Sequence, residues 1–390
     1  MNKETIKIAI VAGEPSGDLL AASLMTSLLH RYPNASFVGI GGPCMKALGF
    51  QSFFPMEMLS VNGLVEVLKH LPSILKMRRK LTKQLIDEKP DIFIGIDSPD
   101  FNLGLEYQLR KRGIRTIHYI SPTIWAWRSG RIHKIAKAVD HMLVLFPFEA
   151  PLYEKQGIGV TYVGHPLADD TPMQPDTEKY RQQLNCTDHS PIFALLPGSR
   201  NSELHFHADL LVQTAERLFK SYPNSTFIVP CATEHIQTLF EAAISRQQAS
   251  NLPFIVLNKQ SSGAIQAADV VILSSGTATL ETALWKKPMV ITYKASWLSV
   301  KIARKMIKLT HVGLPNILLN KEVVPEYLQE DATPENLANA ASHWIDHPEK
   351  VQSLAAEFND LHRLLRKNAS DIAAEAVIAQ LPKDMACIKD

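Results

Sequence analysis

The sequence is poor in cysteine and carries almost no net charge, and each absence excludes a class of protein. Its 390 residues contain four cysteines, at positions 44, 186, 231 and 387, and none of them forms a C-x-x-C pair. A zinc site or a disulfide framework is therefore not expected, and scattered thiols fit a reducing compartment. The formal net charge at pH 7 is only +2, which gives no electrostatic reason to expect a nucleic-acid partner.

Long apolar runs and a P-loop are also missing. No stretch approaches the ~20 uninterrupted apolar residues that span a bilayer. The first residues, Met1–Ile6, lack the apolar segment of a secretory signal, and no G-x-x-x-x-G-K-S/T sequence occurs. We therefore expect a cytoplasmic protein whose contact with any membrane is peripheral.

Apolar, strand-like segments alternate with helical segments along both halves of the chain. Hydrophobic residues make up 46% and charged residues 21% of the sequence, and 390 residues are enough for two cores. Such alternation predicts βαβ units around parallel sheets. The predicted fold is α/β, with two doubly wound, Rossmann-like domains facing a cleft. The predicted strands are Lys7–Ala12, Phe37–Ile40, Ile92–Ile96, Thr116–Ile120, His141–Phe146 and Val160–Val163, then Ile192–Leu196, Thr226–Val229, Phe254–Leu257, Val270–Leu273 and Met289–Thr292.

Proline and polar residues gather between the two sets of strands. This composition predicts a linker over residues 169–188, between an N-terminal domain at 1–168 and a C-terminal domain at 189–347. Residues 348–390 have helical spacing and are expected to cross back to the first domain.

Two loops in the second half combine small residues with charge at predicted strand ends. Pro197–Arg200 precedes a helix whose N-cap we expect at Ser202, and Ser274–Glu281 lies at the equivalent place three predicted strands later. Helix N-termini bind anions, and the Arg200 guanidinium suits a diphosphate. Glu281 could accept from both hydroxyls of a ribose. The pair of loops favours a nucleotide site over two ordinary βα turns.

A carboxylate ends an otherwise apolar strand in the first half. Asp97 follows Ile92–Ile96, and Asp100 lies one turn further on. A carboxylate within hydrogen-bond reach of a hydroxyl can act as a general base, whereas an Asx turn would only cap the loop. We favour catalysis for Asp97 and capping for Asp100, with Asp100 as the next candidate for the base.

An apolar segment, Val61–Leu71, is followed by a basic one. Pro72 is expected to start a second helix that carries several Lys and Arg residues. An apolar helix beside a basic cluster can lie on an anionic membrane surface, and burial in the core or a dimer contact is an equal alternative. The predicted membrane contacts are Val61, Leu64, Val65, Leu68, Leu71, Arg78 and Arg79.

Six motifs together resemble those of the lipid-A-disaccharide synthases. In chain order, over about residues 7 to 380, they are Gly13-Glu-Pro-Ser-Gly-Asp18, Gly95-Ile-Asp-Ser-Pro-Asp-Phe-Asn102, His118-Tyr-Ile-Ser-Pro-Thr-Ile-Trp-Ala-Trp-Arg128, Leu196-Pro-Gly-Ser-Arg200, Ser275-Gly-Thr-Ala-Thr-Leu-Glu281 and Leu314-Pro-Asn316.

The resemblance implies a glycosyltransferase of the GT-B fold. It implies transfer of 2,3-diacylglucosamine from UDP to 2,3-diacylglucosamine 1-phosphate, giving the β-1,6-linked disaccharide 1-phosphate of lipid A synthesis. The expected place is the cytoplasmic face of the inner membrane of Gram-negative bacteria, with the enzyme bound peripherally. No metal or other cofactor is expected, and a homodimer is compatible with the family.

The resemblance and the loops together assign the site residues. Asp97 is the expected base. The donor and its UDP are assigned to Gly198, Ser199, Arg200, Ser275, Gly276, Thr277, Ala278, Glu281 and Asn316. The acceptor is assigned to Glu14, Ser16, Asp18, Asn102, Trp127 and Arg128. Two other functions stay open, a UDP-sugar epimerase or hydrolase of the same fold and a non-catalytic lipid-binding protein.

Overall fold

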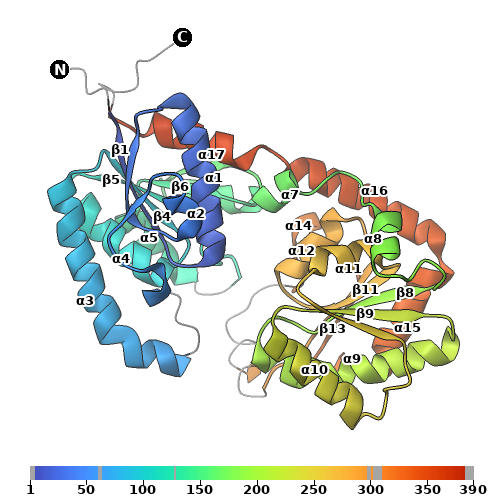
Figure 1. Cartoon of the computed structure of the whole chain (residues 1–390). Helices are drawn as coiled ribbons and strands as arrows, with labels where there is room; N and C mark the ends of the chain where they lie inside the picture. The colour runs from blue at the N-terminus through green and yellow to red at the C-terminus, as the bar shows by residue number, and fades with distance from the viewer. Residues whose placement is uncertain (1–4, 60–63, 127–128, 297–299, 302–309, 383–390) are drawn as a thin grey trace. The chain divides into compact units, whose positions relative to one another are not determined.

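The computed structural model describes residues 5–59, 64–126, 129–296, 300–301 and 310–382 (Figure 1). The chain forms two compact units. The first contains Met1–Asp169 and Leu365–Asp390, and the second contains Asp170–Leu364. The chain therefore leaves the first unit once and returns to it near its end.

The first unit is built on a seven-stranded sheet in the order β3-β2-β1-β4-β5-β6-β7. Neighbouring strands are parallel. The order reverses between β1 and β4, as in doubly wound folds that bind ligands at this point. The strands are β1 (Lys7–Ala12), β2 (Ser36–Ile40), β3 (Gln51–Ser52), β4 (Ile92–Ile96), β5 (Arg115–Tyr119), β6 (His141–Val144) and β7 (Gly159–Tyr162).

Helices follow the strands of the first sheet and cover its faces. The α-helices are α1 (Pro15–Arg31), α2 (Pro43–Lys46), α3 (Leu64–Glu88), α4 (Pro99–Arg110), α5 (Ile132–Ala138), α6 (Ala150–Glu154), α7 (Pro166–Asp170) and α17 (Ala369–Ala379). Short 3-10 helices are η1 (Met56–Met58), η2 (Ser129–Arg131) and η3 (Pro147–Glu149).

Helix α3 is continuous, so the prediction that Pro72 starts a new helix is wrong. Pro72 lies inside Leu64–Glu88. Proline removes one backbone hydrogen bond from a helix but does not by itself separate the flanking turns when other contacts hold them. Here Met77, Leu81 and Leu85 recur at four-residue spacing and are buried in the core beneath α3. This apolar stripe fixes the helix onto the sheet.

Helix α17 packs beside α1, as Figure 1 shows. The Arg31 guanidinium on α1 lies 2.8 Å from the Glu375 carboxylate on α17. At its start, the Asp169 carboxylate accepts from the backbone N–H groups of Lys367, Asn368 and Ala369. A carboxylate on these N–H groups caps the helix and favours its dipole. These contacts hold the returning chain on the first unit.

The second unit repeats the topology with a six-stranded parallel sheet in the order β10-β9-β8-β11-β12-β13. Its strands are β8 (Ile192–Leu196), β9 (Thr226–Cys231), β10 (Phe254–Asn258), β11 (Val270–Ser274), β12 (Met289–Tyr293) and β13 (Glu326–Leu328). Its helices are α8 (Thr177–Gln183), α9 (Asn201–Ser221), α10 (Glu234–Arg246), α11 (Ser261–Ala267), α12 (Thr277–Leu284), α14 (Leu314–Leu319), η4 (Gln329–Asp331), α15 (Pro334–Asp346) and α16 (Pro348–Leu365).

The segment expected as a linker is largely folded onto the second unit. Tyr180 and Leu184 pack against a buried cluster that includes Ile192 of β8. The Arg181 guanidinium pairs with the Asp269 carboxylate at 2.7 Å. The chain passes from the first unit to the second after Asp169 and returns to the first at Leu365.

Candidate active site

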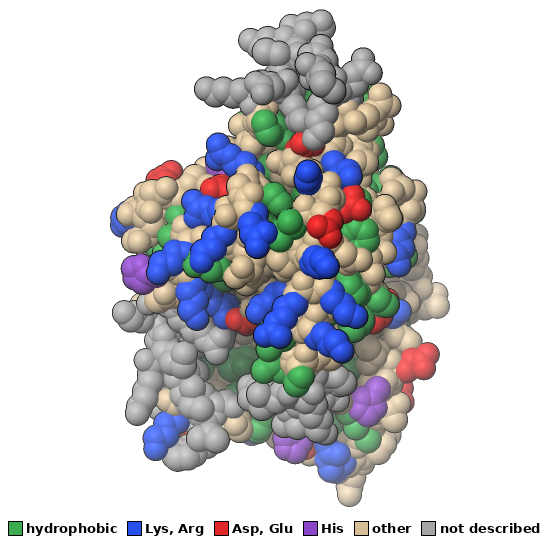
Figure 2. Space-filling view, turned by 90° about the vertical axis from the view of Figure 1, so that its left-hand side faces the viewer, with side chains coloured by type: hydrophobic (Ala, Val, Ile, Leu, Met, Phe, Trp, Pro, Cys, Tyr) green, Lys and Arg blue, Asp and Glu red, His purple; other side chains and the backbone are tan. Residues whose placement is uncertain are grey.

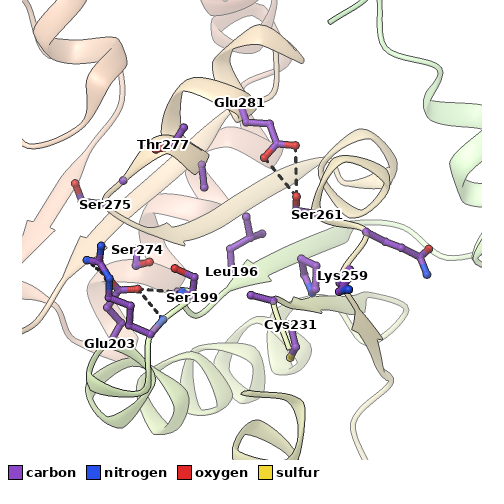
Figure 3. A pocket seen from close by; sticks show the side chains of 17 residues that line it. Leu196, Ser199, Glu203, Cys231, Lys259, Ser261, Ser274, Ser275, Thr277 and Glu281 are labelled. Atoms are coloured by element: carbon purple, nitrogen blue, oxygen red, sulfur yellow. Dashed lines mark hydrogen bonds and ion pairs between the residues drawn. The ribbon is translucent and has the colours of Figure 1, made fainter. Parts of the chain in front are cut away.

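A pocket of about 470 Å³ lies at the carboxyl ends of the strands of the second sheet (Figure 3). It is bordered by the ends of β8 and β11, where the strand order reverses. Eight of the nine residues assigned to the donor line it: Gly198, Ser199, Arg200, Ser275, Gly276, Thr277, Ala278 and Glu281. Loops that are far apart in the sequence thus form one site, in the place that open α/β sheets use for ligands.

The N-terminus of α12 opens into this pocket. Gly276 precedes the helix at φ +156°, and a Cβ there would meet nothing within 4 Å. Thr277 and Ala278 form the first turn and line the pocket. The first N–H groups of a helix have no partner within it and carry the positive end of the dipole. This end suits an anion such as a diphosphate.

The loop after β8 is arranged differently from its prediction. Helix α9 begins at Asn201 with Arg200 as its N-cap, so the expected cap at Ser202 is wrong. The Glu203 carboxylate accepts from the backbone N–H groups of Ser199 at 3.0 Å and Arg200 at 3.3 Å. Gly198, at φ +105°, allows this approach, because a Cβ would lie 2.5 Å from the Glu203 Oε2 atom. An anion bound to these N–H groups would have to displace Glu203.

Glu281 lies on the opposite side of the pocket from the Arg200 loop (Figure 3). The Ser261 hydroxyl is 3.4 Å from each of its carboxylate oxygens. Burial raises the pKa of Glu281, and the Ser261 hydrogen bond partly offsets this. A half-buried carboxylate with a hydroxyl beside it can accept from the vicinal hydroxyls of a ribose.

Sequence reasoning missed the loop that follows β10. Lys259 and Gln260 line the pocket and have left-handed backbones, at φ +63° and +66°. The Lys259 N–H donates to the Cys231 carbonyl at 2.6 Å, which fixes this loop to the end of β9. The sequence does contain a signal for this loop, because its polar residues also follow a predicted strand, Phe254–Leu257. Lys259 is thus a second cation in the pocket lining, in addition to Arg200.

Asn316, the ninth residue assigned to the donor, does not line the pocket. Its side chain is fully buried. Its amide donates to the Val324 carbonyl and the Glu326 carboxylate, both at 2.8 Å, and its oxygen accepts from the Val323 and Val324 N–H groups. Both polar ends of its side chain are therefore engaged within the protein, and its assignment to the donor stays a prediction. Glu326 in turn accepts from the Val312 N–H, and the Val312 carbonyl accepts from the Ser275 hydroxyl. Asn316 thus supports the pocket wall indirectly.

Asp97 lies in a strained turn at the carboxyl end of β4. Asp97 and Ser98 both have left-handed backbones, at φ +47° and +44°. Consecutive non-glycine residues in this region cost free energy and persist where the surroundings hold them. A Cβ on Gly13 would lie 2.6 Å from the Ser98 hydroxyl, so the loops after β1 and β4 touch. Asp97 is therefore at the point where the strand order of the first sheet reverses.

The Asn102 side chain stabilises this turn through hydrogen bonds to its backbone. Its buried amide donates to the Asp97 carbonyl at 2.8 Å and to the Ile96 carbonyl at 3.3 Å. The Asn102 side chain is buried under the turn, and its assignment to the acceptor stays a prediction. Asp100 is in the first turn of α4, is 82% exposed and pairs with the Arg131 guanidinium. Since Asp100 already has a cation partner, Asp97 is the better-placed base.

The other residues assigned to the acceptor have different environments. Glu14 and Ser16 are exposed at the start of α1. Asp18 is buried, and its carboxylate accepts from the N–H groups of Gly42, Cys44 and Met45, which caps α2. These hydrogen bonds give Asp18 a structural role, and its assignment to the acceptor stays a prediction. Trp127 and Arg128 lie outside the described residues.

The residues assigned to the membrane are only partly described. Val61 and the side chains of Leu64, Val65 and Leu68 lie outside the described part of the chain. Leu71 is 40% exposed and Arg79 is exposed, whereas Arg78 is half-buried against α4. Within the described ranges, none of the helices has the length and apolar character needed to cross a bilayer. Among the same residues, no three His, Cys, Asp or Glu side chains are grouped as metal ligands would be.

Comparison with known proteins identifies close relatives. Residues 8–377 match the family model described as lipid-A-disaccharide synthetase. The chain is 51% identical to the lipid-A-disaccharide synthase of Dechloromonas aromatica over 374 residues, covering 96% of this chain and 98% of the relative. It is 48% identical to that of Neisseria meningitidis serogroup A over 379 residues, covering 97% and 99%.

Solved structures share the fold at low sequence identity. MurG from Acinetobacter baumannii superposes with a TM-score of 0.57 at 13% identity, covering 96% of this chain and 99% of that one. Anabaena HepE in complex with UDP and glucose gives 0.55 at 14% identity, covering 96% and 99%. The UDP-GlcNAc 2-epimerase of Neisseria meningitidis gives 0.61 at 12% identity, covering 96% and 100%. The two doubly wound units thus form the GT-B fold. The family match over nearly the whole chain decides against the epimerase alternative. The chain belongs to the lipid-A-disaccharide synthase family of glycosyltransferases.

Proposed function

We propose that the chain transfers 2,3-diacylglucosamine from UDP to the 6-hydroxyl of 2,3-diacylglucosamine 1-phosphate, with inversion at the anomeric carbon. The product is the β-1,6-linked disaccharide 1-phosphate, and UDP leaves. The observation that carries the proposal is the pocket of the second unit, whose charges and helix end suit a nucleoside diphosphate.

The donor occupies that pocket. Glu281 accepts from the ribose hydroxyls, and the α12 N-terminus receives the diphosphate. Arg200 and Lys259 supply positive charge, and the diphosphate displaces the Glu203 carboxylate from the Ser199 and Arg200 N–H groups. Donors held in place before the reaction stabilise charge as it develops on the leaving group. These protein groups would serve without a bound metal.

Asp97 acts as general base. Its carboxylate takes the proton of the acceptor 6-hydroxyl as that oxygen bonds to the anomeric carbon of the donor. The bond from the anomeric carbon to the diphosphate oxygen breaks, and both its electrons leave with UDP. The proton on Asp97 then passes to water. Glu14 and Ser16, exposed beside the Asp97 turn, contact the acceptor sugar.

The N-terminal part of the first unit, about residues 1–168, binds the acceptor and lies on the cytoplasmic face of the inner membrane. The exposed Leu71 and the basic residues Lys76, Arg79 and Lys80 of α3 support this placement, because an apolar segment and cations together favour an anionic surface. We also propose that the enzyme can form a homodimer.

The test is to mix pure protein with both acylated substrates and to measure UDP and the disaccharide. Equal amounts of both products are expected. Release of UDP with free diacylglucosamine instead would make the protein a hydrolase. No consumption of the donor, with a folded protein, would overturn the proposal.

A further inference from the structure

A second cavity, in the first unit, is lined by cations from three helical segments. It has a volume of about 350 Å³. Arg78 comes from α3, Arg131 from η2, and Lys134 and Lys137 from α5. Figure 2 shows Lys and Arg side chains gathered over the face of the molecule that α3 crosses. Four cations around one small cavity indicate an anionic ligand.

Arg78 is held in this cavity by a close fit to α4. A Cβ on Gly104 would lie 2.4 Å from the Arg78 Nη1 atom, so the guanidinium packs directly against α4 at this glycine. The same atom donates to the Asp100 carbonyl at 3.4 Å. Burial lowers the pKa of Arg78, and the neighbouring Arg79 lowers it further. A partly desolvated guanidinium held in one orientation is well prepared for a phosphate.

The charge of the cavity lining is strongly positive. Its carboxylate, Asp100, pairs with Arg131. Arg78, Lys134 and Lys137 therefore exceed the negative charge of the lining. Tyr107 also lines the cavity, and its pKa is lowered by Lys111 and, to a smaller extent, by Lys137. Of these two lysines only Lys137 lines the cavity, so its smaller contribution is the one that concerns the cavity.

The cavity adjoins the turn that carries the proposed base. Pro99 and Asp100, which line it, directly follow Asp97 and Ser98. We propose that this cavity binds the 1-phosphate of the acceptor sugar, an inference that rests on the proposed function. In that acceptor the phosphate and the 6-hydroxymethyl group are attached to the two carbons that flank the ring oxygen. A phosphate anchored in this cavity would therefore keep the 6-hydroxyl within one sugar ring of the lining residues that follow Asp97.

The volume agrees with this role. Small-molecule sites occupy roughly 300–1,000 Å³, so the cavity, of about 350 Å³, fits a phosphate and part of one sugar ring. The acyl chains would remain outside it. The phosphate then selects the acceptor, because a sugar without it would leave three cations unpaired.

The experiment compares two acceptors, with and without the 1-phosphate, at saturating donor. The variant is Lys134→Gln with Lys137→Gln, since both side chains are exposed on α5 and their loss removes no core contact. We expect the wild type to prefer the phosphorylated acceptor in kcat/KM. The variant should lose that preference by at least about tenfold, as expected for weakened charge-assisted hydrogen bonds. Its rate with the unphosphorylated acceptor and its donor KM should stay within about twofold of wild type.

The matched control is Arg112→Gln with Lys155→Gln, which removes two exposed cations of the same unit that do not line the cavity. It should keep the wild-type preference, and Lys134→Arg with Lys137→Arg should restore most of it. An unchanged preference in the Gln variant would overturn the inference. The inference would also be overturned if the Gln variant bound anionic vesicles less well but still preferred the phosphorylated acceptor, because Lys134 and Lys137 would then bind the lipid surface. A wild type that forms no disaccharide would instead overturn the proposed function.

Discussion

Replacing Asp97 by Asn tests the proposed base most directly. The structure favours Asn over Ala for this purpose. Asp97 has φ +47°, where an alanine would cost roughly 1 kcal/mol, whereas Asn tolerates the left-handed region. The hydrogen bonds that hold the turn involve the Asp97 backbone: its carbonyl accepts from Asn102, and its N–H donates to the Tyr119 carbonyl at 2.9 Å. Asp97→Asn should therefore keep the fold.

The expected effect is a large loss of turnover with normal donor binding. General acid–base catalysis contributes about 10²–10⁴ in rate, which corresponds to roughly 3–5 kcal/mol of barrier. UDP binds in the second unit in our proposal, so its affinity should not change. Turnover is measured as UDP release with both acylated substrates, and UDP affinity by calorimetry. Asp100→Asn is the matched control, because it removes the neighbouring carboxylate and its Arg131 ion pair.

A folded Asp97→Asn enzyme with turnover within about threefold of wild type would refute the reasoning. If Asp100→Asn then showed the large loss, Asp100 would be the base, and the Arg131 contact would break on substrate binding. Losses in both variants that disappear at high acceptor concentration would place both carboxylates in binding and not in proton transfer.

Three other predictions concern donor binding, membrane contact and pH. Arg200→Ala should weaken UDP binding by about 1.5 kcal/mol, the low end for a hydrogen bond to a charged group, because the Arg200 side chain is 80% exposed. Glu281→Gln should weaken the binding of UDP more than that of a ribose-free diphosphate. If calorimetry shows that both variants bind UDP as the wild type does, the proposed donor site is wrong. Replacing Leu68 and Leu71 by Ser should reduce sedimentation with anionic vesicles at unchanged melting temperature, whereas a large drop in melting temperature would mean that these residues are core. Burial raises the pKa of Glu149 to about 7 from an ordinary 4.5, so the folded state binds this proton more tightly than the unfolded state. The stability of the fold should therefore fall as the pH rises from about 4.5 through 7. The melting temperature of Glu149→Gln should lack this decline, and parallel curves of melting temperature against pH for the two proteins would contradict the prediction.

The alternating pattern was sufficient to predict the sheets. All eleven predicted strands are present within a few residues of their predicted ends, because buried parallel strands are nearly continuous apolar runs such as Ile192–Leu196. The two strands that were missed, β3 (Gln51–Ser52) and β13 (Glu326–Leu328), are short and lie at the sheet edges. Edge strands are paired on one side only and need no long apolar run, so the sequence carried little sign of them.

The site was predictable as a set of loops but not as a set of contacts. Strand ends identified Pro197–Arg200 and Ser274–Glu281, and the structure brings both to one pocket. Periodicity cannot show which polar group a side chain meets. The Glu203 carboxylate accepts from the N–H groups of Ser199 and Arg200, and the Asn316 amide donates to the Val324 carbonyl. Both are hydrogen bonds that depend on the exact course of the chain. Likewise, the backbone N–H groups that donate to the Asp18 carboxylate, those of Gly42, Cys44 and Met45, are distant from it in sequence.

The two units share one topology but carry different chemistry at the same position. In the first unit, the loops after β1 and β4 present the carboxylates of Glu14 and Asp97. In the second unit, the loops after β8 and β11 present backbone N–H groups, glycines and Arg200. A carboxylate can remove a proton from a hydroxyl but would repel a diphosphate, whereas N–H groups and a guanidinium stabilise a departing diphosphate but cannot act as a base. The shared strand order therefore provides two strand-end sites. In our proposal, the residues at the strand ends assign the acceptor hydroxyl to the first site and the leaving group to the second.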